Sequence, residues 1–151
     1  MPPFSPVMEK ELRSFIPAGG DIIKNPIDAI PIFRYIEIFQ RMIGLVSSQP
    51  QIDMLIISLS LDWLYGVDKG RQIQKVTDYL SGPVGDDLHG KPFIVSWRSY
   101  RNNPAIRKVM DPLEKQLLEA GVPVYRGFEQ ASMTLARWAR YHQFLHARAL
   151  R

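Results

Sequence analysis

The sequence predicts an α/β protein in which a short parallel β-sheet carries helices on both faces. The strongest indication is the continuous apolar run IDMLIISLSL at Ile52–Leu61, because strands covered on both faces lose the alternation of half-exposed strands. A second indication is EAGVPVYRGFEQA at Glu119–Ala131, where one helical pattern ends at a glycine, a short apolar run follows and another helical pattern begins. Helices and strands that alternate in this way form right-handed crossovers between parallel strands.

Length and composition describe one ordinary globular domain. The chain has 151 residues, of which 46% are hydrophobic and 23% charged, so we expect a single domain over residues 1–151. It has no cysteine, which excludes a disulfide framework and thiolate chemistry. Residues 1–6 lack the basic and apolar regions of a secretory signal, and the apolar run Met54–Leu61 is far shorter than the ~20 residues that span a bilayer. We therefore expect a cytoplasmic protein that does not contact a membrane.

The first third of the chain predicts two helices joined by an unusual loop. Apolar residues recur at helical spacing in Val7–Phe15, and Ile32–Ser47 carries a broad apolar stripe after Pro31, a residue suited to the first helical position. The loop between them contains KNPIDAIP at Lys24–Pro31. Asp28 in this loop either caps the following helix within a rigid turn or reaches outward as part of a composite active site.

The rest of the chain alternates between strands and helices. A proline inside a continuous helix costs about 3 kcal/mol, so Pro112 is expected to begin a helix and residues 98–110 to form an irregular or short helical segment. The predicted elements are a helix at about Lys69–Leu80, a strand at Pro92–Trp97, a helix at Pro112–Ala120, a strand at Val122–Tyr125 and a helix at about Phe128–Ala147, with Ala131, Leu135, Trp138, Ala139 and His142 on its inner side.

The predicted sheet is incomplete. It has three strands, and the chain begins with a helix where a doubly wound fold normally has its first strand. An uncovered edge of a parallel sheet is open to pairing with another chain. We therefore expect a second copy, another chain or a missing segment to complete the sheet.

Aromatic and basic side chains follow two of the predicted strands. Ligands of open parallel sheets bind outside the carboxyl ends of the strands, which favours a ligand or partner surface there. Packing beneath the neighbouring segments explains the aromatic residues equally well. The candidate residues are Trp63, Tyr65, Trp97 and Arg98.

The net charge of +4 and the pI of about 9.5 raise the question of nucleic-acid binding. A nucleic-acid footprint requires a coherent basic patch, whereas the densest basic cluster here is explained by the solvated face of a terminal helix. His142 and His146 share a helix face, but no third metal ligand lies near them in the sequence. We expect neither nucleic-acid binding nor a bound metal. The cluster consists of Arg137, Arg140, His142, His146, Arg148 and Arg151.

Four segments of the chain resemble one enzyme family. They are LRSFIPAGGDIIKNPIDAIP, IDMLIISL, KPFIVSW and LLEAGVPVYRGFEQASMTLARWARY, in this order and spacing. Together they are similar to the C-terminal flavodoxin-like domain, of the ligase-CoA type, of NDP-forming acyl-CoA synthetases in the succinyl-CoA synthetase superfamily. The resemblance covers about residues 3–141, and its most specific parts are NPIDAIP and EAGVPVYRGFEQA.

The resemblance implies a flavodoxin-like three-layer sandwich that lacks its first strand and helix. It implies an acid–thiol ligase that interconverts acyl-CoA, nucleoside diphosphate and phosphate with acid, CoA and nucleoside triphosphate through an acyl phosphate and a phosphohistidine. CoA and ATP or ADP with Mg²⁺ would be bound by the full assembly, which adds a CoA-binding Rossmann domain, a second flavodoxin-like domain and an ATP-grasp domain. Asn25, Pro26 and Asp28 match a family signature near a domain interface.

The chain also departs from this family. No histidine has the HTG context of the family's catalytic histidine, and the glycine motifs that hold CoA and nucleotide phosphates are absent. We therefore expect a non-catalytic domain or subunit that binds no cofactor and is inactive alone. The alternative is a stand-alone homo-oligomeric interaction module without ligase activity.

Overall fold

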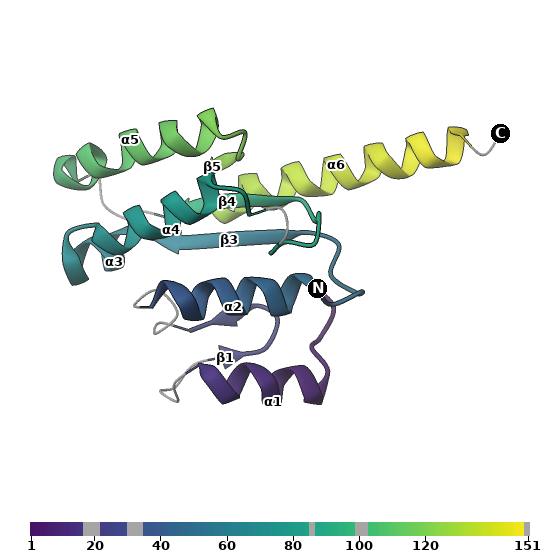
Figure 1. The fold of residues 1–151 in the computed structure, drawn as a ribbon. Coiled ribbons are helices and arrows are strands. Elements are labelled where there is room, and N and C mark those ends of the chain that lie inside the picture. The colour runs from purple at the N-terminus through teal and green to yellow at the C-terminus, as the bar shows by residue number, and fades with distance from the viewer. Residues whose placement is uncertain (17–21, 30–34, 85–86, 99–102, 150–151) are drawn as a thin grey trace.

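The computed structural model describes residues 1–16, 22–29, 35–84, 87–98 and 103–149, and at its centre lies a three-stranded parallel sheet (Figure 1). The strand order is β3-β4-β5, and the register places Leu55 opposite Phe93 and Val95 opposite Val124. The α/β class and the parallel sheet are thus as predicted. The bounds are β3 Leu55–Ser60, β4 Phe93–Arg98 and β5 Val124–Arg126.

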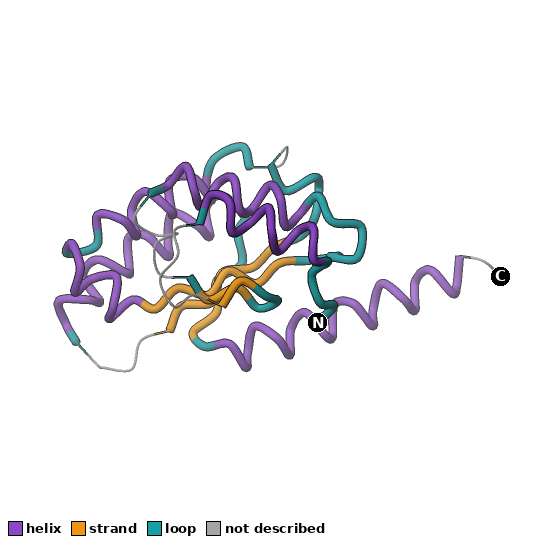
Figure 2. The backbone as a smooth tube through the Cα atoms, turned by 90° about the horizontal axis from the view of Figure 1, so that it is seen from below, coloured by secondary structure: helices purple, strands orange, loops and turns teal. Residues whose placement is uncertain are grey.

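Helices cover both faces of this sheet, and the layers are unequal (Figure 2). In the described part of the chain one face carries only α6, which packs on Ile94 through Ala131 and Leu135. The other helices lie on the opposite side over the main core. Their bounds are α1 Pro6–Phe15, α2 Ile36–Ser47, α3 Leu61–Asp68, α4 Arg71–Ser81, α5 Pro104–Glu119 and α6 Phe128–Ala149.

Alternate residues of β3 face different layers. Leu55, Ile57 and Leu59 are buried in the main core, whereas Ile56 is half-buried on the α6 side and Ser58 is exposed. The strand ends at Ser60 and α3 begins at once, so the predicted strand Ile52–Leu61 is too long at both ends. The apolar run therefore identified the strand, but residues 52–54 precede β3 and Leu61 begins α3.

The segment after β3 forms two helices instead of the one predicted from Lys69. Lys69 and Gly70 have φ angles of 61° and 96°, which interrupt the helical backbone. The Asp68 carboxylate then accepts hydrogen bonds from the backbone N–H groups of Gly70 at 3.1 Å and Gln72 at 3.0 Å. These bonds satisfy donors that a helix N-terminus leaves free, so α4 starts at Arg71.

The prediction that an irregular or short helical segment up to Met110 is separate from a helix starting at Pro112 was wrong, because α5 is one continuous helix with Pro112 inside it. Asn103 caps its start by accepting from the N–H of Ala105 at 2.9 Å, and Pro104 occupies the first turn. Pro112 lies on the exposed face, where water can hydrate the carbonyl that loses its partner. Burial of the opposite face holds the helix together through Ile106, Met110, Leu113 and Leu117.

Pro112→Ala is expected to stabilise the chain by up to about 3 kcal/mol, because alanine restores the missing backbone hydrogen bond and removes the ring clash. The measurement is the free energy of unfolding in urea. Pro104→Ala is the matched control and should change that free energy little, because the first turn needs no N–H from this residue. Equal effects of the two substitutions would contradict a continuous α5.

The last helix extends past the sheet (Figures 1 and 2). Ala131 and Leu135 are buried as predicted, but Trp138 is 41% exposed and His142 is exposed, so their assignment to an inner side was wrong. The apolar stripe continues along the helix after the sheet beneath it has ended. We call residues 136–149 the α6 overhang.

Candidate functional site

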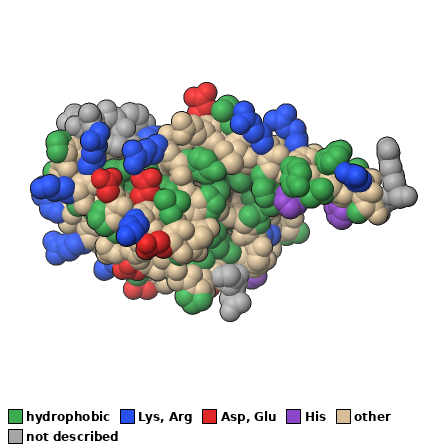
Figure 3. All heavy atoms as spheres, turned by 90° about the horizontal axis from the view of Figure 1, so that it is seen from above, with side chains coloured by type: hydrophobic (Ala, Val, Ile, Leu, Met, Phe, Trp, Pro, Cys, Tyr) green, Lys and Arg blue, Asp and Glu red, His purple; other side chains and the backbone are tan. Residues whose placement is uncertain are grey.

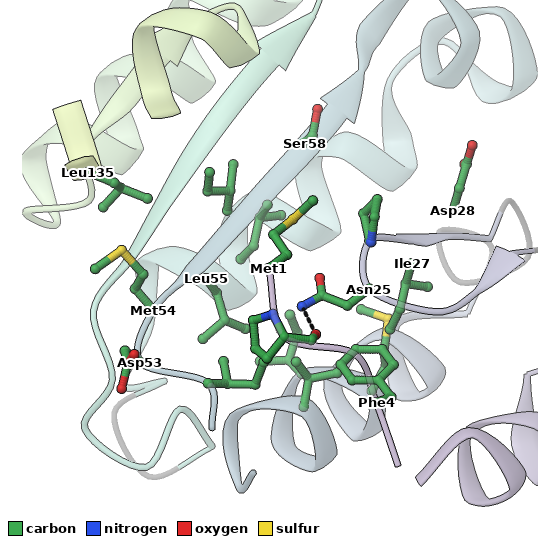
Figure 4. A pocket seen from close by; sticks show the side chains of 18 of the residues that line it. Met1, Phe4, Asn25, Ile27, Asp28, Asp53, Met54, Leu55, Ser58 and Leu135 are labelled. Atoms are coloured by element: carbon green, nitrogen blue, oxygen red, sulfur yellow. Dashed lines mark hydrogen bonds between the residues drawn. The ribbon is translucent and has the colours of Figure 1, made fainter. Parts of the chain in front are cut away.

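An apolar groove of about 480 Å³ lies along the outer side of β3 (Figure 4). Five segments line it: residues 1–4, 25–29, 39–46, 51–58 and 128–135. We call it the edge groove. Its volume falls within the range of about 300–1,000 Å³ that is usual for ligand sites.

One wall of the edge groove is the outer edge of β3. The Leu55 N–H donates to the Pro92 carbonyl at 3.0 Å, so the odd-numbered residues of β3 direct their backbone groups toward β4. Successive residues point to opposite edges, so Ile56 and Ser58 direct their N–H and C=O groups into the groove. Within the described part of the chain, β3 pairs with β4 alone.

A short hairpin that sequence reasoning had assigned to a loop forms another wall. Its strands, β1 Ile22–Ile23 and β2 Ile27–Asp28, pair antiparallel around a turn with a cis peptide bond between Asn25 and Pro26. The Asn25 Nδ2 donates to the carbonyl of Pro2 at 2.9 Å, which ties the turn to the N-terminal segment. The isoleucines Ile22, Ile23 and Ile27 could have indicated these strands, but each strand has only two residues.

Asp28 lies at the end of β2 and its side chain is exposed. Helix α2 begins at Ile36 after Tyr35, so Asp28 does not cap it, and its exposed side chain reaches outward. The predicted helix start at Ile32 falls in residues 30–34, outside the described residues. Figure 4 shows Asn25 at the groove and Asp28 at its far side.

The four strand-end candidates do not form one surface. Trp97 is 2% exposed and belongs to the main core, so the packing alternative accounts for it. Trp63 and Tyr65 are half-buried on α3 against that core, and the ammonium of Lys69 lies 5.3 Å from the Tyr65 ring centre. Arg98 is exposed at the end of β4.

The α6 overhang carries exposed aromatic and basic side chains together (Figure 3). The Trp138 and His142 rings lie 4.1 Å apart between centroids, and Tyr141 is 58% exposed. The basic residues predicted to lie on a solvated face are exposed at Arg137, Arg140, His142, His146 and Arg148, whereas Arg151 lies outside the described residues. The overhang is an exposed surface of both apolar and cationic character.

A cluster of hydrogen bonds joins Asp87, in the connector before β4, to helices α2 and α4. The Tyr79 hydroxyl donates to Asp87 Oδ2 at 2.8 Å, and the buried Ser47 hydroxyl donates to the Asp87 carbonyl at 2.6 Å. Burial, and secondarily the hydrogen bond and the charge of Asp87, raise the pKa of Tyr79 well above its ordinary value. Asp87 therefore serves as a structural acceptor here.

Tyr79→Phe is expected to weaken the dependence of stability on alkaline pH. A raised pKa means that folding favours the protonated tyrosine, so this contribution is present below about pH 10 and is lost as the pH rises further toward the folded-state pKa. Urea unfolding between about pH 9 and about pH 12 measures the slope. The same slope in the parent and the variant would contradict the assignment.

No group of histidine, cysteine, aspartate and glutamate in the described residues could hold a metal ion. None of the described helices has the length and apolar character needed to cross a bilayer. Comparisons with protein-family models, with curated proteins and with solved structures find no match to this chain. The function is therefore inferred from the residues of this chain and from their arrangement in the fold and the edge groove.

Proposed function

We propose that this chain is a non-catalytic domain or subunit of an NDP-forming acyl-CoA synthetase. The observation that supports this best is the position in the fold of the two most specific resembling segments. NPID at residues 25–28 forms the turn and second strand of the hairpin beside the edge groove. EAGVPVYRGFEQA at Glu119–Ala131 comprises the end of α5, all of β5 and the start of α6.

The proposed role is to support an active site assembled with other chains or domains. Partners would contribute the CoA-binding and ATP-grasp domains together with the phosphate-carrying histidine, and CoA and ATP or ADP with Mg²⁺ would bind in that assembly. The exposed Asp28 and the half-buried Asn25 give the hairpin polar groups that can hydrogen-bond across an interface. Their attachment to a fixed hairpin reduces the ordering cost of such contacts.

The test is a ligase assay on the chain alone and on the complex that co-purifies with it from its native extract. We expect acid, CoA and nucleoside triphosphate to be converted to acyl-CoA only by the complex. Asp28→Ala and Asn25→Ala should each lower the activity of the complex by about tenfold, the effect of about 1.4 kcal/mol of lost stabilisation. Asp111→Ala on exposed α5 is the matched control and should have no effect.

Either of two results would refute the proposal. One is ligase activity of the chain alone; the other is a complex with a CoA-binding and an ATP-grasp partner that has no such activity. Mass spectrometry of the complex identifies the partners.

The alternative is a homo-oligomeric interaction module without ligase activity, and the exposed Trp138, Tyr141 and Phe144 of the α6 overhang favour it. It predicts that the purified chain forms an oligomer by light scattering and that Tyr141→Ser with Phe144→Ser makes it monomeric. A monomer at high concentration would eliminate this alternative.

A further inference from the structure

Among the described residues, no strand pairs with the outer edge of β3, and β3 itself lacks the features that usually protect a sheet edge. Natural edges carry lysine, proline, bulges or covering segments that prevent pairing with another chain. Residues 55–60, LIISLS, contain no charge and no proline, and their register with β4 runs without a bulge. Ile56 and Ser58 accordingly present their backbone donors and acceptors along an apolar groove.

The two faces beside this edge are both apolar. Ile43 of α2 and Phe4 line the groove on the side of the main core, while Leu135 and Phe128 of α6 line it on the other side. An extended chain in the groove would send alternate side chains to these two sides. Because both sides are apolar, such a chain should be a continuous aliphatic run, as expected for an inner strand of a parallel sheet.

The charged side chains of the groove further restrict the kind of segment that can bind in it. Asp53, just before β3, and Asp28 are the charged side chains among the described residues that line it. They lie near opposite ends of the groove, with Asp53 beside the start of β3 (Figure 4). A strand with lysine or arginine at its ends complements these carboxylates.

This charge pattern disfavours a second copy of β3 as the occupant. A copy of β3 would bring its own Asp53 and Asp62, which flank the strand in sequence, toward the carboxylates of the groove. The row of backbone N–H and C=O groups at Ile56 and Ser58 likewise fits a polypeptide better than a compact small molecule. An added strand forms hydrogen bonds with such an edge residue by residue.

From the edge, the faces and the charges, we propose that the edge groove receives an extended aliphatic segment with basic ends from a partner polypeptide, and that this segment adds to β3 as a parallel fourth strand. The side chain of Met1 lies across the groove and is 83% exposed, so an incoming strand can displace it without opening the core. The proposal does not depend on the reaction proposed above, because it follows from the sheet alone.

Amide hydrogen exchange by NMR tests this residue by residue. In the isolated chain, the amides of Ile56 and Ser58 should exchange at least about tenfold faster than those of Ile57 and Leu59, which bond to β4. The probe is the synthetic peptide acetyl-Lys-Val-Ile-Val-Thr-Val-Ile-Lys-amide at millimolar concentration. It should slow exchange at Ile56 and Ser58, and a peptide with proline in place of the central valines should not.

Ser58→Pro provides the matched variant. The Ser58 N–H points away from β4, so proline there leaves the β3–β4 hydrogen bonds in place and removes a donor needed only by the added strand. Ser58→Ala keeps the N–H and is the control. We expect Ser58→Pro to retain the parent circular dichroism and lose the response to the peptide, and Ser58→Ala to retain both.

Several results would overturn the proposal. Slow exchange of Ile56 and Ser58 in the isolated monomer would mean that the edge is already covered. Protection that rises with the chain's own concentration would make a second copy the occupant. No effect of the peptide, or an equal effect of the proline-containing peptide, would exclude strand addition whether or not Ser58→Pro folds.

Discussion

Trp97→Ala is expected to lower the free energy of unfolding by about 3–5 kcal/mol, the usual cost of truncating a large buried aromatic side chain. Trp97 is 2% exposed in the middle strand of the sheet, where it packs in the main core. Its truncation would leave a cavity next to residues that have no means of filling it without moving the sheet. The measurement is urea unfolding followed by circular dichroism.

Trp97→Phe is the matched control. It keeps most of the buried ring volume and removes the indole N–H, which has no hydrogen-bond partner among the described residues. We expect Trp97→Phe to lower the free energy of unfolding clearly less than Trp97→Ala does, since an unpartnered buried donor contributes no stabilisation. If Trp97→Ala unfolds at the same urea concentration as the parent, Trp97 is a surface residue. That result would favour a ligand or partner surface at the end of β4.

Gly70→Ala should have the second-largest effect, a loss of about 2–4 kcal/mol from backbone strain and overpacking together. Gly70 has a φ of 96°, which L side chains rarely adopt. A Cβ atom there would lie 2.8 Å from Cγ1 of Val109, so the turn between α3 and α4 could no longer approach α5 closely. Thermal and urea unfolding both report the change.

A double variant separates the two causes. Val109→Ala removes the methyl group that the new Cβ would meet, so Gly70→Ala should cost less in its presence, by at least about 0.5 kcal/mol of coupling. The part that remains is the cost of the backbone conformation. Strict additivity of the two substitutions would contradict the close approach of this turn to α5.

The elements that the sequence predicted well are those whose burial is continuous along the chain. The run at Ile52–Leu61 identified β3, and the glycine break at Gly121 correctly separated α5 from β5. Gly121 has a φ of 79°, the left-handed conformation that ends many helices. Local pattern sufficed there because each residue's environment follows from its immediate neighbours.

The errors arose where tertiary contacts outweigh local preference. Pro112 disfavours a helix locally, but the buried face of α5 keeps the helix continuous through it. The apolar stripe on the last helix predicted buried residues as far as His142, whereas Leu135 is the last residue of α6 that is buried against the sheet. A helical period identifies an apolar face and cannot specify how much of that face another element covers.

The candidate site was predictable only in its parts. The loop with Asn25 and Asp28 was singled out from its residues, and the three-stranded sheet from the order of elements. Their meeting at the edge groove depends on the hairpin lying beside β3 and α6, segments far apart in the sequence. No spacing along the chain encodes that proximity.

The central claim is that this chain works within an assembly that completes its sheet. Amide exchange at Ile56 and Ser58, compared between the isolated chain and the chain purified with the CoA-binding and ATP-grasp partners proposed above, tests it most directly. We predict fast exchange in isolation and exchange in the complex as slow as that of Ile57. Equally fast exchange in both states would show that the partner leaves the edge of β3 open and would contradict the claim.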